Sequence, residues 1–97
     1  LDEAAREIHK AEDGSYLIAG SATLRDVNRQ LDWSLPDEHV STIAGLLIHE
    51  AQKIPDAGEH LVVHGFRFTV VEKDDTQITV LRVEKLPETR LPDDVEL

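Results

Sequence analysis

The spacing of the apolar residues changes once along this chain of 97 residues, at Pro55. Between Val40 and Ile54 the apolar residues recur every three or four positions, which is the period of a helix with one packed face. Over residues 60–86 they alternate or form short runs, which is typical of β-strands. Proline forces the residue before it out of the helical conformation, and Gly58 supplies a flexible turn. The chain therefore has to combine a helix with a sheet.

The segments before this helix follow similar rules. Thr23 stands three positions before Asp26, which is close to the capping pattern at the start of a helix. A short stretch with an aromatic and a β-branched residue ends at Gly20, as a strand would. The expected strands cover residues 15–19, 60–65, 66–73 and 77–86, and the expected helices cover residues 23–31 and 41–53.

The predicted fold class is α+β, with a mostly antiparallel sheet of four or more strands and two main helices packed on one face. A chain of this size buries about two thirds of its unfolded surface, so we expect one core of modest depth. Ile43, Leu47, Phe68 and Leu81 lie on the apolar faces of their segments. We expect these four side chains to be buried.

The last two strands predict a hairpin, whose turn we place at Asp74–Asp75. With that turn, Val71 lies opposite Ile78, on the face that does not meet the helices. Both faces of the hairpin then carry apolar side chains. We predict that the second face, formed by Val71, Ile78 and Val80, contacts a partner.

Composition limits the range of partners. The chain has 20 acidic and 10 basic residues, so its formal net charge is −10. Phosphate backbones and anionic lipids repel such a surface, so we expect no nucleic-acid binding. No apolar run approaches the roughly 20 residues that span a bilayer, so we expect no direct membrane insertion by this segment. The chain has no cysteine, which excludes thiolate metal sites and fits a reducing compartment.

We divide the chain into three parts. Residues 1–13 are polar and acidic, and we expect them to be the remnant of a linker, since the chain begins with Leu1 rather than methionine. Residues 14–86 hold every predicted strand and helix. Residues 87–97 contain two prolines and four acidic residues, and we expect an acidic mobile tail there.

The order and spacing of several residues between 13 and 86 resemble the CorC/HlyC transporter-associated domain. A strand ends in a glycine before a serine, a Thr-x-x-Gly sequence lies in the second helix, an Ile-Pro…Gly-Glu break follows, and Gly-Phe-x-Phe-x-Val leads the last hairpin. Asp74–Asp75 departs from the pattern, because the usual turn glycine is missing. The main motif residues are Gly20, Thr42, Gly45, Pro55, Gly58, Gly65 and Phe68.

The resemblance implies a domain at the C-terminus of integral membrane proteins, after a transmembrane module and a pair of CBS domains. Such proteins are associated with magnesium and cobalt efflux, and the domain is thought to modulate ion transport. The resemblance also implies a position on the cytoplasmic side of the cell membrane. Its expected partners are the other domains of the same transporter, with a homodimer as a second arrangement. The fold looks similar to part of the FAD-binding domains of some oxidases.

The polar residues predict no chemistry of their own. His60 and His64 lie four residues apart on an expected strand, roughly 13 Å from each other, so they cannot bind one ion. His49 has no second ligand one helical turn later. The acidic residues follow no calcium-loop pattern, and no serine lies in a Gly-x-Ser-x-Gly elbow. We therefore predict no catalytic residue, no metal ligand and no enzyme activity.

A nucleotide is the main alternative ligand. Neither Gly-x-Gly-x-x-Gly nor Walker-A spacing occurs, and the acidic balance opposes a phosphate. We expect no cofactor, and keep FAD as a minor alternative. The leading hypothesis is a non-catalytic regulatory or interaction domain of an integral membrane ion transporter. The alternatives are a module that binds FAD or another nucleotide, and a domain that senses divalent cations through its acidic surface.

Overall fold

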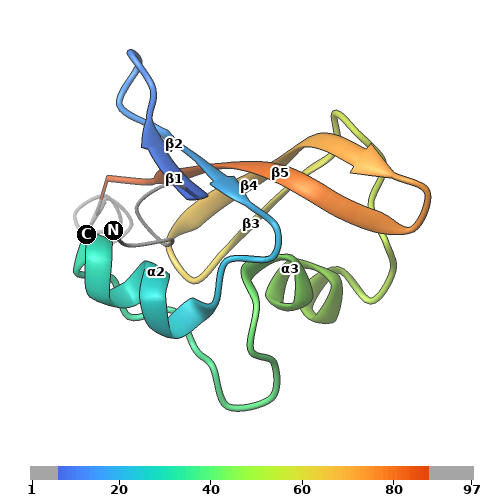
Figure 1. Cartoon of the computed structure of the whole chain (residues 1–97), viewed down its shortest axis with the longest axis horizontal. Coiled ribbons are helices and arrows are strands. Elements are labelled where there is room, and N and C mark those ends of the chain that lie inside the picture. Colours follow the sequence, from blue (N-terminus) through green and yellow to red (C-terminus); the bar gives the residue numbers. More distant parts are fainter. Residues whose placement is uncertain (1–6, 88–97) are drawn as a thin grey trace, which may run out of the picture.

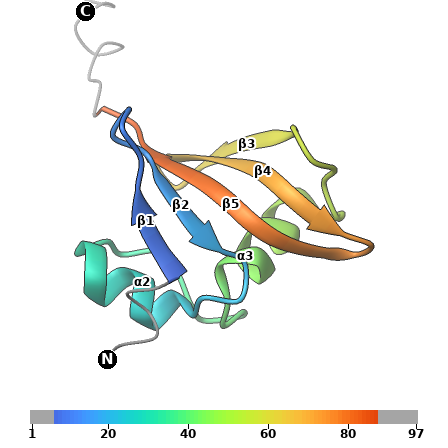
Figure 2. The ribbon, with the colours of Figure 1, turned by 45° about the horizontal axis from the view of Figure 1, so that its top comes forward.

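The computed structural model describes residues 7–87. Five strands form one antiparallel sheet in the order β1–β2–β5–β4–β3 (Figure 1). Two helices, α2 (Leu24–Leu31) and α3 (Ile43–Ala51), lie on the same side of this sheet (Figure 2). The α+β class and the one-sided arrangement are therefore confirmed. The strands are β1 (Ile8–Lys10), β2 (Tyr16–Ala19), β3 (His60–Val63), β4 (Phe66–Asp74) and β5 (Gln77–Lys85).

A threonine caps the start of each helix. The Oγ1 atom of Thr23 accepts a hydrogen bond from the N–H of Asp26, and Oγ1 of Thr42 accepts one from Gly45, both at 3.1 Å. Thr23 and Thr42 also pair through an isolated antiparallel bridge, so both helices begin at one place in the fold. A Cβ atom at Gly45 would lie 3.0 Å from Oγ1 of Thr42. The nearest atoms to such a Cβ are therefore side-chain atoms of Thr42 and Val40, and not another backbone.

Gly20 joins the sheet to the start of α3. Its N–H donates to the carbonyl of Thr79 in β5 at 3.0 Å, and its carbonyl accepts from the N–H of Ala44 in α3 at 3.1 Å. A Cβ atom at this position would overlap the carbonyl oxygen of Ile78 and lie 3.2 Å from Cβ of Ala44. Only glycine allows β2, β5 and α3 to approach this closely.

The core lies between the sheet and the two helices. Ile43, Leu47, Phe68 and Leu81 are at most 1 % exposed, which confirms the predicted core members. Aromatic rings close one end of it. The ring of Trp33 lies between two other aromatic rings, with its centroid 5.5 Å from that of Tyr16 and 4.5 Å from that of Phe66.

Strand β1 lies in a segment that the sequence predicted as a linker. Ile8–Lys10 pair antiparallel with β2, so this part of the segment belongs to the sheet. Asp13 holds the turn that follows, because its Oδ1 accepts hydrogen bonds from the N–H and the hydroxyl of Ser15 at 2.9 and 2.6 Å. Arg82 of β5 reaches the other carboxylate oxygen at 3.1 Å. Residues 1–6 and 88–97 lie outside the described residues, so the linker and tail predictions stay untested there.

The β4–β5 hairpin turns at Asp75–Thr76, one residue later than predicted. Asp75 takes up the left-handed conformation, with φ of 63°, that a turn glycine usually supplies. Lys73, and not Val71, therefore pairs with Ile78. The pairing also shifts register next to Val71, and this bulge turns Ile78 toward the helices, where it is 5 % exposed. The prediction that Ile78 belongs to the outer face is wrong.

Candidate functional site

The outer sheet face, opposite α2 and α3, carries a small apolar patch near the tip of the β4–β5 hairpin. Val71 is 38 % exposed at the bulge of β4, and the half-buried Val80 of β5 pairs with Ala19 of β2 on one side and with Glu72 of β4 on the other. Two of the three residues predicted for the interaction face, Val71 and Val80, therefore lie there. Ala19 is a member that sequence reasoning missed, because its pairing with β5 is not visible in either segment alone.

Ion pairs lie on the same outer sheet face, farther from the tip of the β4–β5 hairpin than the patch. Nη1 of Arg67 lies 3.3 Å from Oε1 of Glu84, and Nη1 of Arg82 lies 3.1 Å from Oδ2 of Asp13. The hydrogen bonds from Ser15 and the charge of Arg82 lower the pKa of Asp13 from its ordinary value of 3.8. Exposed pairs of this kind add little stability. An apolar patch with a polar rim is, however, the usual composition of a protein contact surface.

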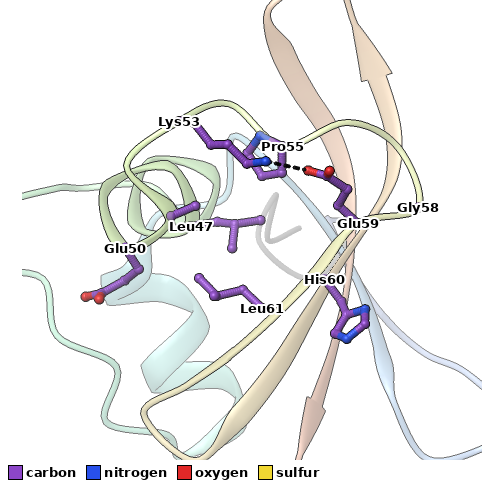
Figure 3. Close-up of a pocket in the computed structure, with 9 residues that line it drawn as sticks. Leu47, Glu50, Lys53, Pro55, Gly58, Glu59, His60 and Leu61 are labelled. Atoms are coloured by element: carbon purple, nitrogen blue, oxygen red, sulfur yellow. Dashed lines mark ion pairs between the residues drawn. The ribbon is translucent and has the colours of Figure 1, made fainter.

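A second concave surface, the α3–β3 groove, lies between the end of α3 and strand β3 (Figure 3). Leu47 from the helix and Leu61 from the strand point toward each other across it, and its volume is about 520 Å³. The ion pair between Lys53 and Glu59, at 3.4 Å, lies at one end. Sequence reasoning did not identify this groove. Its only sequence signal is the break at Pro55, which separates the helix from the strand.

The start of α3 leaves no unbonded donor for a phosphate. The N–H groups of Ile43, Ala44 and Gly45 all donate to acceptors within the domain, at 3.0–3.1 Å. Anion binding at the N-terminus of a helix depends on N–H groups that have no such acceptor. This helix end therefore does not form a cradle for the pyrophosphate of a dinucleotide.

Two of the histidine rings stack on each other, and two others lie on or next to β3. His60 is exposed on β3, whereas Nε2 of His64 lies 3.0 Å from Oε2 of Glu50. The rings of His39 and His49 stack with their centroids 5.7 Å apart. Within residues 7–87, no three His, Asp or Glu side chains come together in a way that could hold a metal ion.

The family model of the transporter associated domain, CorC_HlyC, matches residues 9–87. The chain belongs to this family. A UPF0053 protein of Haemophilus influenzae is 37% identical over 81 residues, which cover 84% of this chain and 19% of that protein. The magnesium and cobalt efflux protein CorC of Buchnera aphidicola is 26% identical over 91 residues, which cover 94% of this chain and 31% of that protein. This transporter-associated domain thus spans a third or less of these curated relatives.

Solved structures share its fold. The CorC_HlyC domain of a Xylella fastidiosa hemolysin, determined in complex with Mg²⁺ and Mn²⁺, superposes with a TM-score of 0.72 at 28% identity, covering 84% of this chain and 99% of that one. A functionally unknown conserved protein from Haemophilus influenzae gives a TM-score of 0.77 at 37% identity, covering 81% and 98%. Between residues 7 and 87, none of the helices has the length and apolar character needed to cross a bilayer.

The motif residues of this transporter-associated domain serve mainly to shape it. Three lie together where β2 meets the start of α3, and two lie in the loop between α3 and β3. One occupies the β3–β4 turn with φ of 82°, and one is fully buried in the core. In that order they are Gly20, Thr42 and Gly45, then Pro55 and Gly58, then Gly65, and finally Phe68.

Proposed function

We propose that this domain is a non-catalytic regulatory domain that contacts the other domains of an integral membrane ion transporter through its outer sheet face. The observation that carries the proposal is the apolar patch of the exposed Val71 and the half-buried Ala19 and Val80 on a sheet face that no described helix covers. Apolar side chains gathered on one face, next to charged pairs, favour a docking surface over a catalytic site.

The relatives support the wider setting. Several are named magnesium and cobalt efflux proteins, and each is about three times as long as this chain or longer. We therefore propose divalent-cation efflux as the process that the domain regulates, from the cytoplasmic side of the membrane. The proposal includes no cofactor, and a homodimer remains a second arrangement of the same face.

The test is Val71→Asp in the full-length transporter. A buried carboxylate in the contact would be costly to desolvate, so we expect weaker association with the other domains and altered magnesium or cobalt efflux from cells. Ile54→Asp is the matched control, because Ile54 is 39 % exposed but lies in the loop after α3. Both isolated variant domains should melt close to the parent, since surface substitutions change stability by about 0.5 kcal/mol or less. Unchanged efflux and association in Val71→Asp would contradict the proposal.

A further inference from the structure

We propose that the α3–β3 groove binds an extended peptide segment, which adds to the sheet as a sixth strand beside β3. The segment we infer is basic, with one large apolar side chain that enters the groove. This goes beyond the proposed function, because the groove and the outer sheet face are different surfaces of the domain.

Strand β3 presents an open edge. It is the last strand of the sheet, and β4 is the only described strand that pairs with it. Val63 and Phe66 flank a two-residue turn, so they form a hydrogen-bonded pair, and such pairs alternate along an antiparallel ladder. The N–H and C=O groups of His60 and Val62 therefore point away from β4. Edge groups of this kind recruit extended segments of other chains.

The groove lies directly beside this edge. Side chains of a strand alternate between its two faces, so every second side chain of an added segment would point to the helix side of the sheet. There it would meet the apolar floor made by Leu47 and Leu61, with α3 as the opposite wall (Figure 3). Ala51 lines the groove near the end of the helix and leaves it wide, at about 520 Å³. One large apolar side chain fits this shape, and a polar one would lose its hydration there.

The charge of the domain favours a basic peptide in the α3–β3 groove. Two carboxylates line the groove, those of Glu50 and Glu59. Oε1 of Glu59 lies 3.4 Å from Nζ of Lys53, which also lines the groove, and Oε2 of Glu50 lies 3.0 Å from Nε2 of His64. The whole chain carries a formal charge of −10. A second copy would bring the same negative charge and be repelled, whereas a basic segment is attracted. We therefore assign the edge to a basic peptide and not to a second copy of this chain.

The test uses a fluorescein-labelled peptide of sequence Thr-Lys-Thr-Leu-Thr-Lys-Thr, in which the central leucine and both lysines lie on the face that points to the groove. We expect saturable binding by fluorescence anisotropy. Val62→Pro removes one N–H group from the open edge of β3, and edge strands tolerate proline at such a position. This variant should bind the peptide about tenfold more weakly or worse. Val62→Ala is the matched control and should bind within about threefold of the parent, since only the backbone of Val62 is used.

A second variant tests the groove itself. Ala51→Phe should fill the cavity and weaken peptide binding, while a thermal melt shows that the domain still folds. Val71→Asp on the outer sheet face should leave peptide binding unchanged, so the failure of either proposal can be recognised separately. Three results would overturn the inference: no saturable binding of the lysine peptide, equal binding of the matched peptide Thr-Glu-Thr-Leu-Thr-Glu-Thr, or a parent dimer that Val62→Pro dissociates. The last result would assign the edge to a second copy.

Discussion

At the scale of single residues, a few positions decide how closely the elements approach. Gly20 hydrogen-bonds to β5 and α3 through its own backbone, and it has no room for a side chain. Thr42 caps α3 and also pairs with Thr23 at the start of α2. Both residues of the family pattern therefore set how closely the layers pack.

Gly20→Ala should destabilise the domain by about 1–3 kcal/mol or more, because the new methyl group meets the carbonyl of Ile78, which cannot move without breaking the sheet. Denaturant unfolding measures the change. Gly45→Ala is the control, since its methyl group meets only side-chain atoms, the hydroxyl of Thr42 at 3.0 Å and Cβ of Val40 at 3.6 Å. Alanine is about 1 kcal/mol more favourable than glycine inside a helix, which offsets the cost of the close contact. The Gly45→Ala variant should therefore be about as stable as the parent. Equal losses in both variants would show that Gly20 is not special.

Phe68→Ala should cost about 3–5 kcal/mol, because the ring is completely buried in the core and its removal leaves a cavity. A domain of this size has a total stability of about 5–10 kcal/mol, so the variant should be close to unfolding at room temperature. Val71→Ala removes apolar atoms from an exposed position of the same strand and serves as the control. A melting temperature lowered by only a degree or two in Phe68→Ala would contradict this role.

At the scale of elements, local sequence patterns predicted the helices and strands whose own residues show a cap or an apolar period. Both helices begin at a capping threonine, and the strands after Pro55 follow their alternation. Strand β1 was missed because three residues give no periodicity, and its hairpin is fixed by Arg82, which lies 69 positions from Asp13. The β4–β5 turn was placed one residue early because Asp75 takes up a conformation usually reserved for glycine or asparagine. That shift, together with the bulge, moved Ile78 into the core.

The pH dependence of the β1–β2 hairpin should follow Asp13. Hydrogen bonds from Ser15 and the charge of Arg82 lower its pKa in the folded state below 3.8. Its stabilising effect is therefore complete above 3.8 and is lost as the pH falls through the lower folded value. Asp13→Asn should melt below the parent at neutral pH, and the difference should shrink in acid.

Thermal melts from about pH 7 to about pH 2 measure this difference. Asp37→Asn is the control for the loss of one negative charge, because Asp37 forms no ion pair with another described residue. A gap between Asp13→Asn and the parent that stays constant across the acid range would show that the carboxylate of Asp13 is not stabilised by folding.

At the scale of the whole molecule, the sequence predicted a sheet with helices on one face, and the structure confirms this arrangement. It could not predict the α3–β3 groove, which forms between Leu47 and Leu61, from a helix and a strand that meet only after folding. The sequence predicted only part of the apolar patch, because one of its members joins the others only through strand pairing. Val71 and Val80 follow from alternation, whereas Ala19 comes to them through the pairing of β2 with β5.

The overall charge and the bonded start of α3 together predict that the domain binds no flavin. FAD would bring a pyrophosphate to a chain of charge −10, and the first N–H groups of α3 already have acceptors. We expect no flavin absorbance in the purified domain and no saturable heat on titration with FAD. Salt separates the two causes, because about 0.5 M NaCl screens repulsion between exposed charges but creates no donors. Binding that appears only at high salt would show that repulsion alone excludes FAD, and stoichiometric binding at low salt would favour the ligand-binding alternative instead.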